Sequence, residues 1–172
     1  MPRPRSLPIL ALVLLATACL GAACEGGPPP VTPTPVAGTA GDPREVNIVA
    51  KDYLFLPDTL DLVPGETVLL HVINGGLEVH EAVIGDAAVQ EAWEIAEAGT
   101  VGAPPGPTPV VSVPPEVAGL RIVVASGERV DVRWTVPLDA PDGPSDWVVG
   151  CHIPGHWEKG MQVPIRWLAN GA

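Results

Sequence analysis

Strict alternation of apolar and polar residues runs through positions 129–136. One face would carry Val130, Val132, Trp134 and Val136, and the other Arg129, Asp131, Arg133 and Thr135. Because successive side chains of a β-strand point to opposite faces, this pattern predicts a strand with one buried face. Residues 46–50 and 163–167 repeat the alternation, and Pro164 suggests that the second of these strands lies at a sheet edge.

Further apolar runs, bounded by turn residues, predict four more strands. They cover residues 67–73, 80–84, 120–125 and 147–150, and Pro64-Gly65 marks a turn before the first of them. The chain has 22 Pro and 19 Gly among 172 residues, a composition that disfavours a helical bundle. About seven short strands joined by turns predict an all-β fold, a Greek-key β-sandwich.

One segment of about residues 86–119 interrupts the strands. Asp86 is placed to cap a short helix through Ala98, with Val89, Trp93 and Ala96 on one face. A Pro-rich loop at 99–115 follows. We therefore expect a short helical and Pro-rich insertion in the sandwich.

The first 23 residues have the parts of an export signal peptide. Arg3 and Arg5 precede an apolar run, and small residues lead to Cys24. The 16 uncharged residues at 9–24 are fewer than the roughly 20 that a membrane-spanning helix needs. Leu20-Gly21-Ala22-Ala23-Cys24 resembles a bacterial lipobox, which implies a lipid anchor on Cys24; Cys19 fits nearly as well, and an ordinary cleaved signal remains an alternative.

Residues 24–43 are rich in Pro, Gly and Thr. A segment of this composition stays extended, so we predict that it is a tether. The folded domain is expected at 44–172. The whole chain has 20 Asp and Glu but only 9 Lys and Arg, which gives a formal net charge of −11. Basic clusters for phosphate contacts are missing, which argues against nucleic-acid binding.

Cys151 is the one cysteine of the expected domain, because the other two lie at the end of the leader. Taken alone, it could be an inert buried thiol. However, His152, His156 and Met161 follow it within ten positions. A thiolate, imidazoles and a thioether are the donors that suit copper, whereas the oxygen ligands of Mg²⁺ or Ca²⁺ are missing here. Two His and one Cys with a distant Met form a one-electron copper site.

A second imidazole must come from elsewhere in the chain. His71 lies within the predicted strand 67–73, where an ordinary sheet-surface histidine is the simpler interpretation. His80 follows the turn 74–79 and begins the next strand, so it is expected at the same end of the sandwich as the Cys151 loop. We therefore predict His80 as the ligand.

These motifs together resemble the blue copper proteins, the cupredoxins. Asn74 stands six positions before His80, and the spacing Cys151-x4-His156-x4-Met161 is similar to that of auracyanins and rusticyanins. The resemblance implies one type 1 copper held by His80, Cys151, His156 and, axially, Met161. It also implies that Asn74 ties the two ligand loops together.

His152 needs a separate interpretation. Cys-His-x3-His-x4-Met also resembles the last copper motif of multicopper oxidases, but their oxygen-reducing cluster needs about eight histidines by that resemblance, and this chain has four. A binuclear copper centre would need a second cysteine in the loop. His152 is therefore expected at the surface or beside the ligand Cys151, where it can tune the site by hydrogen bonding.

The resemblance implies a membrane-tethered carrier of single electrons, not an enzyme, because no coordination position is left for a substrate. We expect a monomer at the outer face of the cytoplasmic membrane or in the periplasm. Its redox partner would be a cytochrome, a respiratory or photosynthetic complex, or an oxidase. The alternative is a copper chaperone or scavenger.

Trp157 has two interpretations. By resemblance, the ring edge of His156 should lie at the surface, and Trp157 beside it would form an apolar patch for partner docking. Otherwise, the indole folds back onto the sandwich.

Overall fold

The computed structural model describes residues 35–102, 111–138 and 146–169. The strands are β1 (Arg44–Lys51), β2 (Leu54–Leu56), β3 (Leu60–Leu62), β4 (Thr67–Asn74), β5 (His80–Gly85), β6 (Leu120–Val124), β7 (Arg129–Thr135), β8 (Val148–Gly150) and β9 (Gln162–Trp167). The helical elements are α1 (Ala87–Ala98) and two short 3₁₀ turns, η1 (Pro115–Val117) and η2 (Trp157–Lys159). The expected signal peptide, Cys24 and most of the tether lie outside the described residues.

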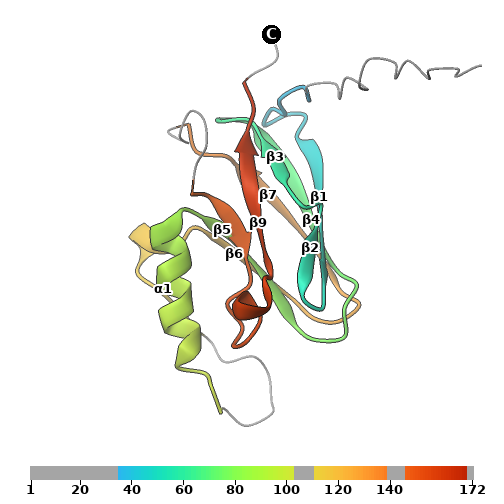
Figure 1. The fold of residues 1–172 in the computed structure, drawn as a ribbon. Coiled ribbons are helices and arrows are strands. Elements are labelled where there is room, and N and C mark those ends of the chain that lie inside the picture. Colours follow the sequence, from blue (N-terminus) through green and yellow to red (C-terminus); the bar gives the residue numbers. More distant parts are fainter. Residues whose placement is uncertain (1–34, 103–110, 139–145, 170–172) are drawn as a thin grey trace, which may run out of the picture. The chain divides into compact units, whose positions relative to one another are not determined.

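The strands form two sheets that face each other as the expected β-sandwich (Figure 1). The order is β2-β1-β4-β7 in one sheet and β3-β9-β8-β5-β6 in the other. The β1–β4 and β3–β9 pairs are parallel, and the remaining pairs are antiparallel. None of the helices in these described segments is long and apolar enough to cross a membrane.

The core lies between the inner faces of the two sheets. It combines side chains of both sheets, among them Ile48, Leu70, Val72, Ala82, Ile84, Val149 and Ile165. β7 follows the predicted alternation: Arg129, Asp131 and Arg133 are exposed, whereas Val130, Val132 and Trp134 pack against the core. The alternation thus identified the buried face of this strand correctly.

The predicted helix is present and begins at the predicted cap. The Asp86 side chain accepts a hydrogen bond from the Val89 N–H at 3.0 Å. α1 packs beside β5 and β8, outside the five-stranded sheet (Figure 1). As a result all six residues of β5 are buried, because one face of the strand meets the core and the other meets α1.

The strand prediction missed two short strands, and its edge position for Pro164 is wrong. β2 and β3 have only three residues each and carried no clear periodic signal. Pro164 lies in β9, which has neighbours on both sides and is not an edge strand. β3 begins to pair with β9 only at Ile165, so no β3 residue faces Pro164 and its missing N–H is tolerated there.

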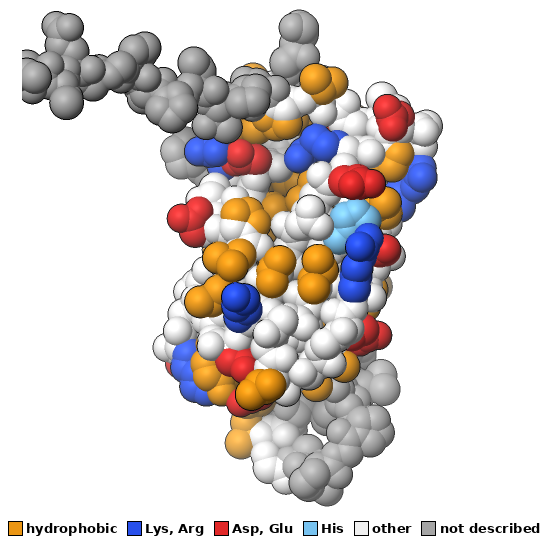
Figure 2. Space-filling model, turned by 90° about the vertical axis from the view of Figure 1, so that its right-hand side faces the viewer, with side chains coloured by type: hydrophobic (Ala, Val, Ile, Leu, Met, Phe, Trp, Pro, Cys, Tyr) orange, Lys and Arg blue, Asp and Glu red, His pale blue; other side chains and the backbone are white. Residues whose placement is uncertain are grey.

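Figure 2 looks onto the outer face of the four-stranded sheet, where apolar side chains lie among charged ones. Leu56, Val49 and Ile73 are register partners across β2, β1 and β4. His71 also lies in this sheet, 2.8 Å from Asp131 on β7. It is therefore a sheet histidine, as its simpler interpretation predicted, but it is only 5% exposed and so does not lie at the sheet surface.

Candidate metal centre

The loops that follow β4 and β8 meet at one end of the sandwich and bring together the predicted donors. His80 begins β5, Cys151 directly follows β8, and His156 precedes η2. Met161 follows η2 and leads into β9. In the described residues, the group of side chains able to hold a metal ion consists of His80, Cys151 and His156. His71 takes no part in it.

Local hydrogen bonds fix the shape of the Cys151 loop. The Cys151 N–H donates to the Met161 carbonyl at 3.1 Å, and the Met161 N–H donates to the His156 carbonyl at 3.2 Å. Gly160 closes η2 at φ 91°, a left-handed conformation that glycine adopts without strain. The loop therefore ties Met161 to two of the donors through its backbone, and its side chain is fully buried.

The donor atoms lie at distances that suit a shared metal ion. His80 Nδ1 is 3.2 Å from His156 Nδ1, and Cys151 Sγ is 3.3 Å from the same nitrogen. Two nitrogens about 2.0–2.1 Å from a metal and about 120° apart would be roughly 3.5 Å from each other. The three side chains are also shielded from water, with exposed fractions of 0%, 0% and 2%.

Carboxylates on the far side of each imidazole set its tautomer. His80 Nε2 lies 2.7 Å from Asp52 Oδ1, and His156 Nε2 lies 3.1 Å from Glu78 Oε2. A carboxylate accepts, so each Nε2 must carry a proton, and in a neutral imidazole Nδ1 is then a bare acceptor. Two bare nitrogens facing each other at 3.2 Å cannot share a hydrogen bond. His80, Cys151 and His156 could hold a metal cation, which would supply the missing attraction.

The protonation of these groups agrees with a metal site. Burial lowers the pKa of His156, which favours the neutral imidazole that binds a metal. Burial also raises the pKa of the Cys151 thiol to about 12. Because the ligand is the thiolate, metal binding must displace this proton.

Asp52 and Glu78 are held as anions in turn. The Leu77 N–H donates to Asp52 at 2.8 Å, and this bond, with the one from His80, lowers the pKa of Asp52. The Tyr53 hydroxyl donates to Glu78 at 2.6 Å, and this bond, with the one from His156, lowers the pKa of Glu78. Sequence analysis missed all three side chains, because Asp52 and Tyr53 lie more than 20 residues from the ligands they support.

Comparison with known proteins agrees with this geometry. No model of a known protein family matches the sequence. The copper-resistant cuproprotein CopI of Pseudomonas aeruginosa is 25% identical over 140 residues, covering 69% of this chain and 72% of that protein. Auracyanin from Roseiflexus castenholzii, in a dithionite-reduced crystal structure, is similar with a TM-score of 0.55 at 16% identity, covering 72% of this chain and 96% of that one.

A second solved structure, auracyanin A of Chloroflexus aurantiacus, is titled a "blue" copper protein. Its TM-score is 0.51 at 24% identity, covering 73% of this chain and 99% of that one. The chain has the cupredoxin fold. At the expected end of this cupredoxin sandwich, the buried His-Cys-His group fits one type 1 copper ion.

His156 differs from the expectation that its ring edge reaches the protein surface. It is 2% exposed, because Glu78 holds its Nε2 and the Tyr53 ring meets it edge-on at 4.8 Å between centroids. The Lys159 ammonium lies over the Tyr53 ring, 3.5 Å from the ring centre. The side chains of Glu78 and Tyr53 thus cover the His156 ring.

His152 is buried, so the part of its prediction that placed it at the surface is wrong. Its Nδ1 lies 2.7 Å from Glu94 Oε2, and its Nε2 lies 2.7 Å from Gln90 Oε1. Both acceptors belong to α1, so the helix of the insertion reaches the residue next to the copper cysteine. Trp157 stacks on His152, at 4.6 Å between ring centroids and 17° between planes. This placement matches the interpretation in which the indole folds back.

Asn74 organises one ligand loop and not two. Its side chain donates to the carbonyls of Glu78 at 2.7 Å and Val124 at 3.0 Å, and accepts from the Gly76 N–H at 2.8 Å. These bonds join the loop before His80 to β6, and the described residues show no side-chain hydrogen bond from Asn74 to the Cys151 loop. The expected tie between the two loops is therefore corrected.

Asn74→Ala is expected to destabilise the protein by about 2 kcal/mol, because it leaves buried backbone groups without partners. Urea unfolding of the metal-free protein would measure the change. Asn47→Ala is the matched control, since Asn47 is exposed on β1, and its effect should be near zero. Equal losses in both variants would contradict the role assigned to Asn74.

Proposed function

We propose that the protein is a type 1 copper protein that carries single electrons between redox partners, and not an enzyme. The observation that supports this most is the pair of Nδ1 atoms of His80 and His156, which face each other and the Cys151 sulfur while carboxylates hold both rings from behind. Copper, when bound, supplies the one-electron chemistry.

The protein's own residues would keep this site rigid. Asp52 and Glu78 orient the two imidazoles, and the backbone bonds of the loop hold Cys151 against Met161. A site whose ligands are fixed in this way needs little rearrangement when its charge changes by one. Full burial of the donors also keeps water and substrates out, which supports a carrier.

The proposed location and partners follow from the leader and from charge. A signal peptide at 1–23 would direct export, and a lipid on Cys24 with the tether at 24–43 would then hold the domain at the outer face of the cytoplasmic membrane or in the periplasm. Without residues 1–23, which hold two Arg and no acidic residue, the chain has 7 Lys and Arg against 20 Asp and Glu, a net charge of −13. This charge favours a basic redox protein such as a cytochrome as the partner of a monomer.

The decisive experiment is the absorption and electron-paramagnetic-resonance spectrum of the Cu(II)-loaded protein, followed by reduction with ascorbate. We expect an intense blue or green band and narrow copper hyperfine splitting, lost on reduction and regained on reoxidation. Weak colour with ordinary tetragonal copper signals would contradict the proposal.

Copper handling is the second candidate, and the similarity to a copper-resistant cuproprotein favours it. A carrier keeps its copper while electrons come and go, whereas a delivery or scavenging protein must release or capture the ion. Two measurements separate these functions: transfer of copper to a chelator, followed over hours, and electron exchange with a redox partner, followed over seconds. Rapid loss of Cu(I) to the chelator would favour handling.

Met161→Leu is expected to leave copper bound and to raise the reduction potential. Leucine fills nearly the same volume, so the buried site stays packed, but the thioether that stabilises Cu(II) is lost. Voltammetry of the two proteins would measure the shift. An unchanged potential would argue against Met161 as the axial ligand.

A further inference from the structure

A stacked pair of rings, His152 and Trp157, adjoins the metal centre. His152 follows Cys151 directly in the chain, and Trp157 follows His156. The pair is therefore bonded through the backbone to two of the three donor residues, and its rings lie 4.6 Å apart and nearly parallel. No other aromatic contact of the described residues joins the neighbours of two donors in this way.

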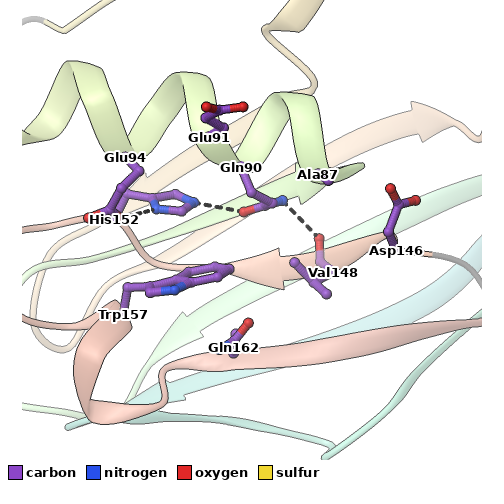
Figure 3. A pocket seen from close by; sticks show the side chains of 9 residues that line it. All are labelled: Ala87, Gln90, Glu91, Glu94, Asp146, Val148, His152, Trp157 and Gln162. Atoms are coloured by element: carbon purple, nitrogen blue, oxygen red, sulfur yellow. Dashed lines mark hydrogen bonds and ion pairs between the residues drawn. The ribbon is translucent and has the colours of Figure 1, made fainter.

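The stacked pair borders a surface pocket of about 340 Å³ between α1 and the β8–β9 segment (Figure 3). Ala87 on α1 and, across the pocket, Val148 and the Trp157 indole are the apolar part of its lining (Figure 3). Its acidic side chains are Glu91, Glu94 and Asp146, and no Lys or Arg is among the described residues that line it. Such a pocket suits a cationic side chain with an aliphatic stem, which Lys and Arg both provide.

The ring geometry at the pocket is fixed. The Gln90 amide nitrogen donates to the carbonyls of Val83, Gly85 and Val148 at 3.2–3.3 Å, which turns its oxygen toward His152 (Figure 3). Glu94 holds the opposite nitrogen of the same ring. By contrast, Glu78 and Tyr53 cover the His156 ring, which is 2% exposed, so a docked partner would not contact that ring directly.

We propose that this pocket is the docking site of a basic redox protein and that electrons pass between partner and copper through the His152–Trp157 pair. The inference rests on the proposed electron-carrier function. In each event the reduced site loses one electron and a one-electron acceptor, such as a ferric haem protein, gains it; no bond forms or breaks and no proton moves. The partner contributes Lys or Arg side chains that enter the pocket between Glu91 and Asp146.

Mitochondrial cytochrome c, a basic haem protein, serves as the probe. In a titration of the Cu(I) protein at low salt, followed by nuclear magnetic resonance, the indole N–H signal of Trp157, assigned with Trp157→Phe, should shift. Glu91→Gln with Asp146→Asn removes two acidic side chains of the pocket without touching the Glu94–His152 pair. We expect this double variant to bind roughly three- to twentyfold more weakly, as two exposed charge pairs would predict.

The matched control is Glu45→Gln with Asp58→Asn, which removes the same charge from exposed positions outside the pocket. Its affinity for cytochrome c should change by less than about twofold. The second-order rate constant of electron exchange should fall by the same factor as the affinity in the pocket variant. Equal weakening in both double variants, or an unmoved Trp157 signal, would overturn the docking site.

Two further outcomes separate the claims. If the pocket variant binds more weakly but exchanges electrons at the wild-type rate, docking at the pocket is unproductive and the electron route is wrong. If the wild-type protein exchanges no electrons with either an electrode or cytochrome c, the proposed carrier function itself fails. Reversible voltammetry of all three proteins therefore precedes the binding comparison.

Discussion

Cys151→Ser is expected to abolish the intense thiolate-to-copper absorption band while the sandwich stays folded. The band requires a sulfur donor, and a serine hydroxyl neither ionises readily nor supplies a soft ligand. The side chain is fully buried in the core cluster, so the new hydroxyl costs about 1–3 kcal/mol in folding free energy. Absorption and electron-paramagnetic-resonance spectra after copper loading, with circular dichroism for the fold, would check this.

Cys24→Ser is the matched control for this prediction. The same atom is replaced, but at the position expected to carry the lipid, far from the donor set in the sequence. That variant should keep the full blue band and lose only its membrane attachment. An intense thiolate-to-copper band that persists in Cys151→Ser would contradict the assignment of Cys151 as the thiolate ligand.

Sequence analysis predicted the two donors of this loop, Cys151 and His156, because the determinants of the loop are local. Cys151, His156 and Met161 fall within eleven residues, and glycines at 155 and 160 take the left-handed conformations that the loop requires. The helix at 87–98 was equally predictable, because its cap and its apolar face lie in one short segment. Local patterns of this kind need no knowledge of what the rest of the chain contributes.

The support of the site was not predictable, because it depends on contacts between distant segments. Asp52 reaches His80 across 28 positions and Glu78 reaches His156 across 78. Neither carboxylate carries a sequence signal that separates it from the other 18 acidic residues. The burial of Glu81 was not predictable either. The alternation of a strand would expose this residue, but α1, from another segment of the chain, covers that face of β5.

Glu81 belongs to a buried charge network beside the metal centre. The Arg121 guanidinium donates to Glu81 and, at 2.6 Å, to Glu97 on α1. The other oxygen of Glu81 accepts the backbone N–H of His152 at 3.0 Å. One cation therefore serves two carboxylates whose side chains are 0% and 2% exposed. The network joins α1 to the strand that carries His80.

Arg121→Leu is expected to destabilise the protein by about 3–5 kcal/mol at pH 7. The substitution leaves two buried carboxylates without their cation, which costs far more than the net worth of an intact pair. Urea unfolding of the metal-free protein would measure the loss. Arg166→Leu is the control: its bidentate pair with Asp61 is 61% and 30% exposed, so the loss should not exceed about 1 kcal/mol.

The pH dependence of unfolding gives this network a signature that packing alone would not produce. Burial first, and the neighbouring Glu81 charge second, raise the pKa of Glu97 above its ordinary 4.5, whereas Arg121 lowers it. A carboxyl with a raised folded-state pKa binds its proton more tightly in the folded protein than in the unfolded chain. Its protonation therefore adds fully to the free energy of unfolding below pH 4.5, and this stabilisation is lost as pH rises through the folded-state pKa. Without Arg121, the folded-state pKa of Glu97 rises further, because the cation that lowers it is lost.

The deficit of Arg121→Leu should therefore shrink as pH falls from 7 toward 5, because protonation removes one of the two uncompensated charges. Glu97→Gln, which leaves a one-to-one pair of Arg121 and Glu81, should remove this pH dependence, and it should also rescue part of the stability when combined with Arg121→Leu. Unfolding titrations of the four proteins across this range would show both effects. A deficit that stays constant with pH, and that Glu97→Gln does not reduce, would mean that Arg121 acts through packing against Trp93, whose ring it covers at 4.6 Å.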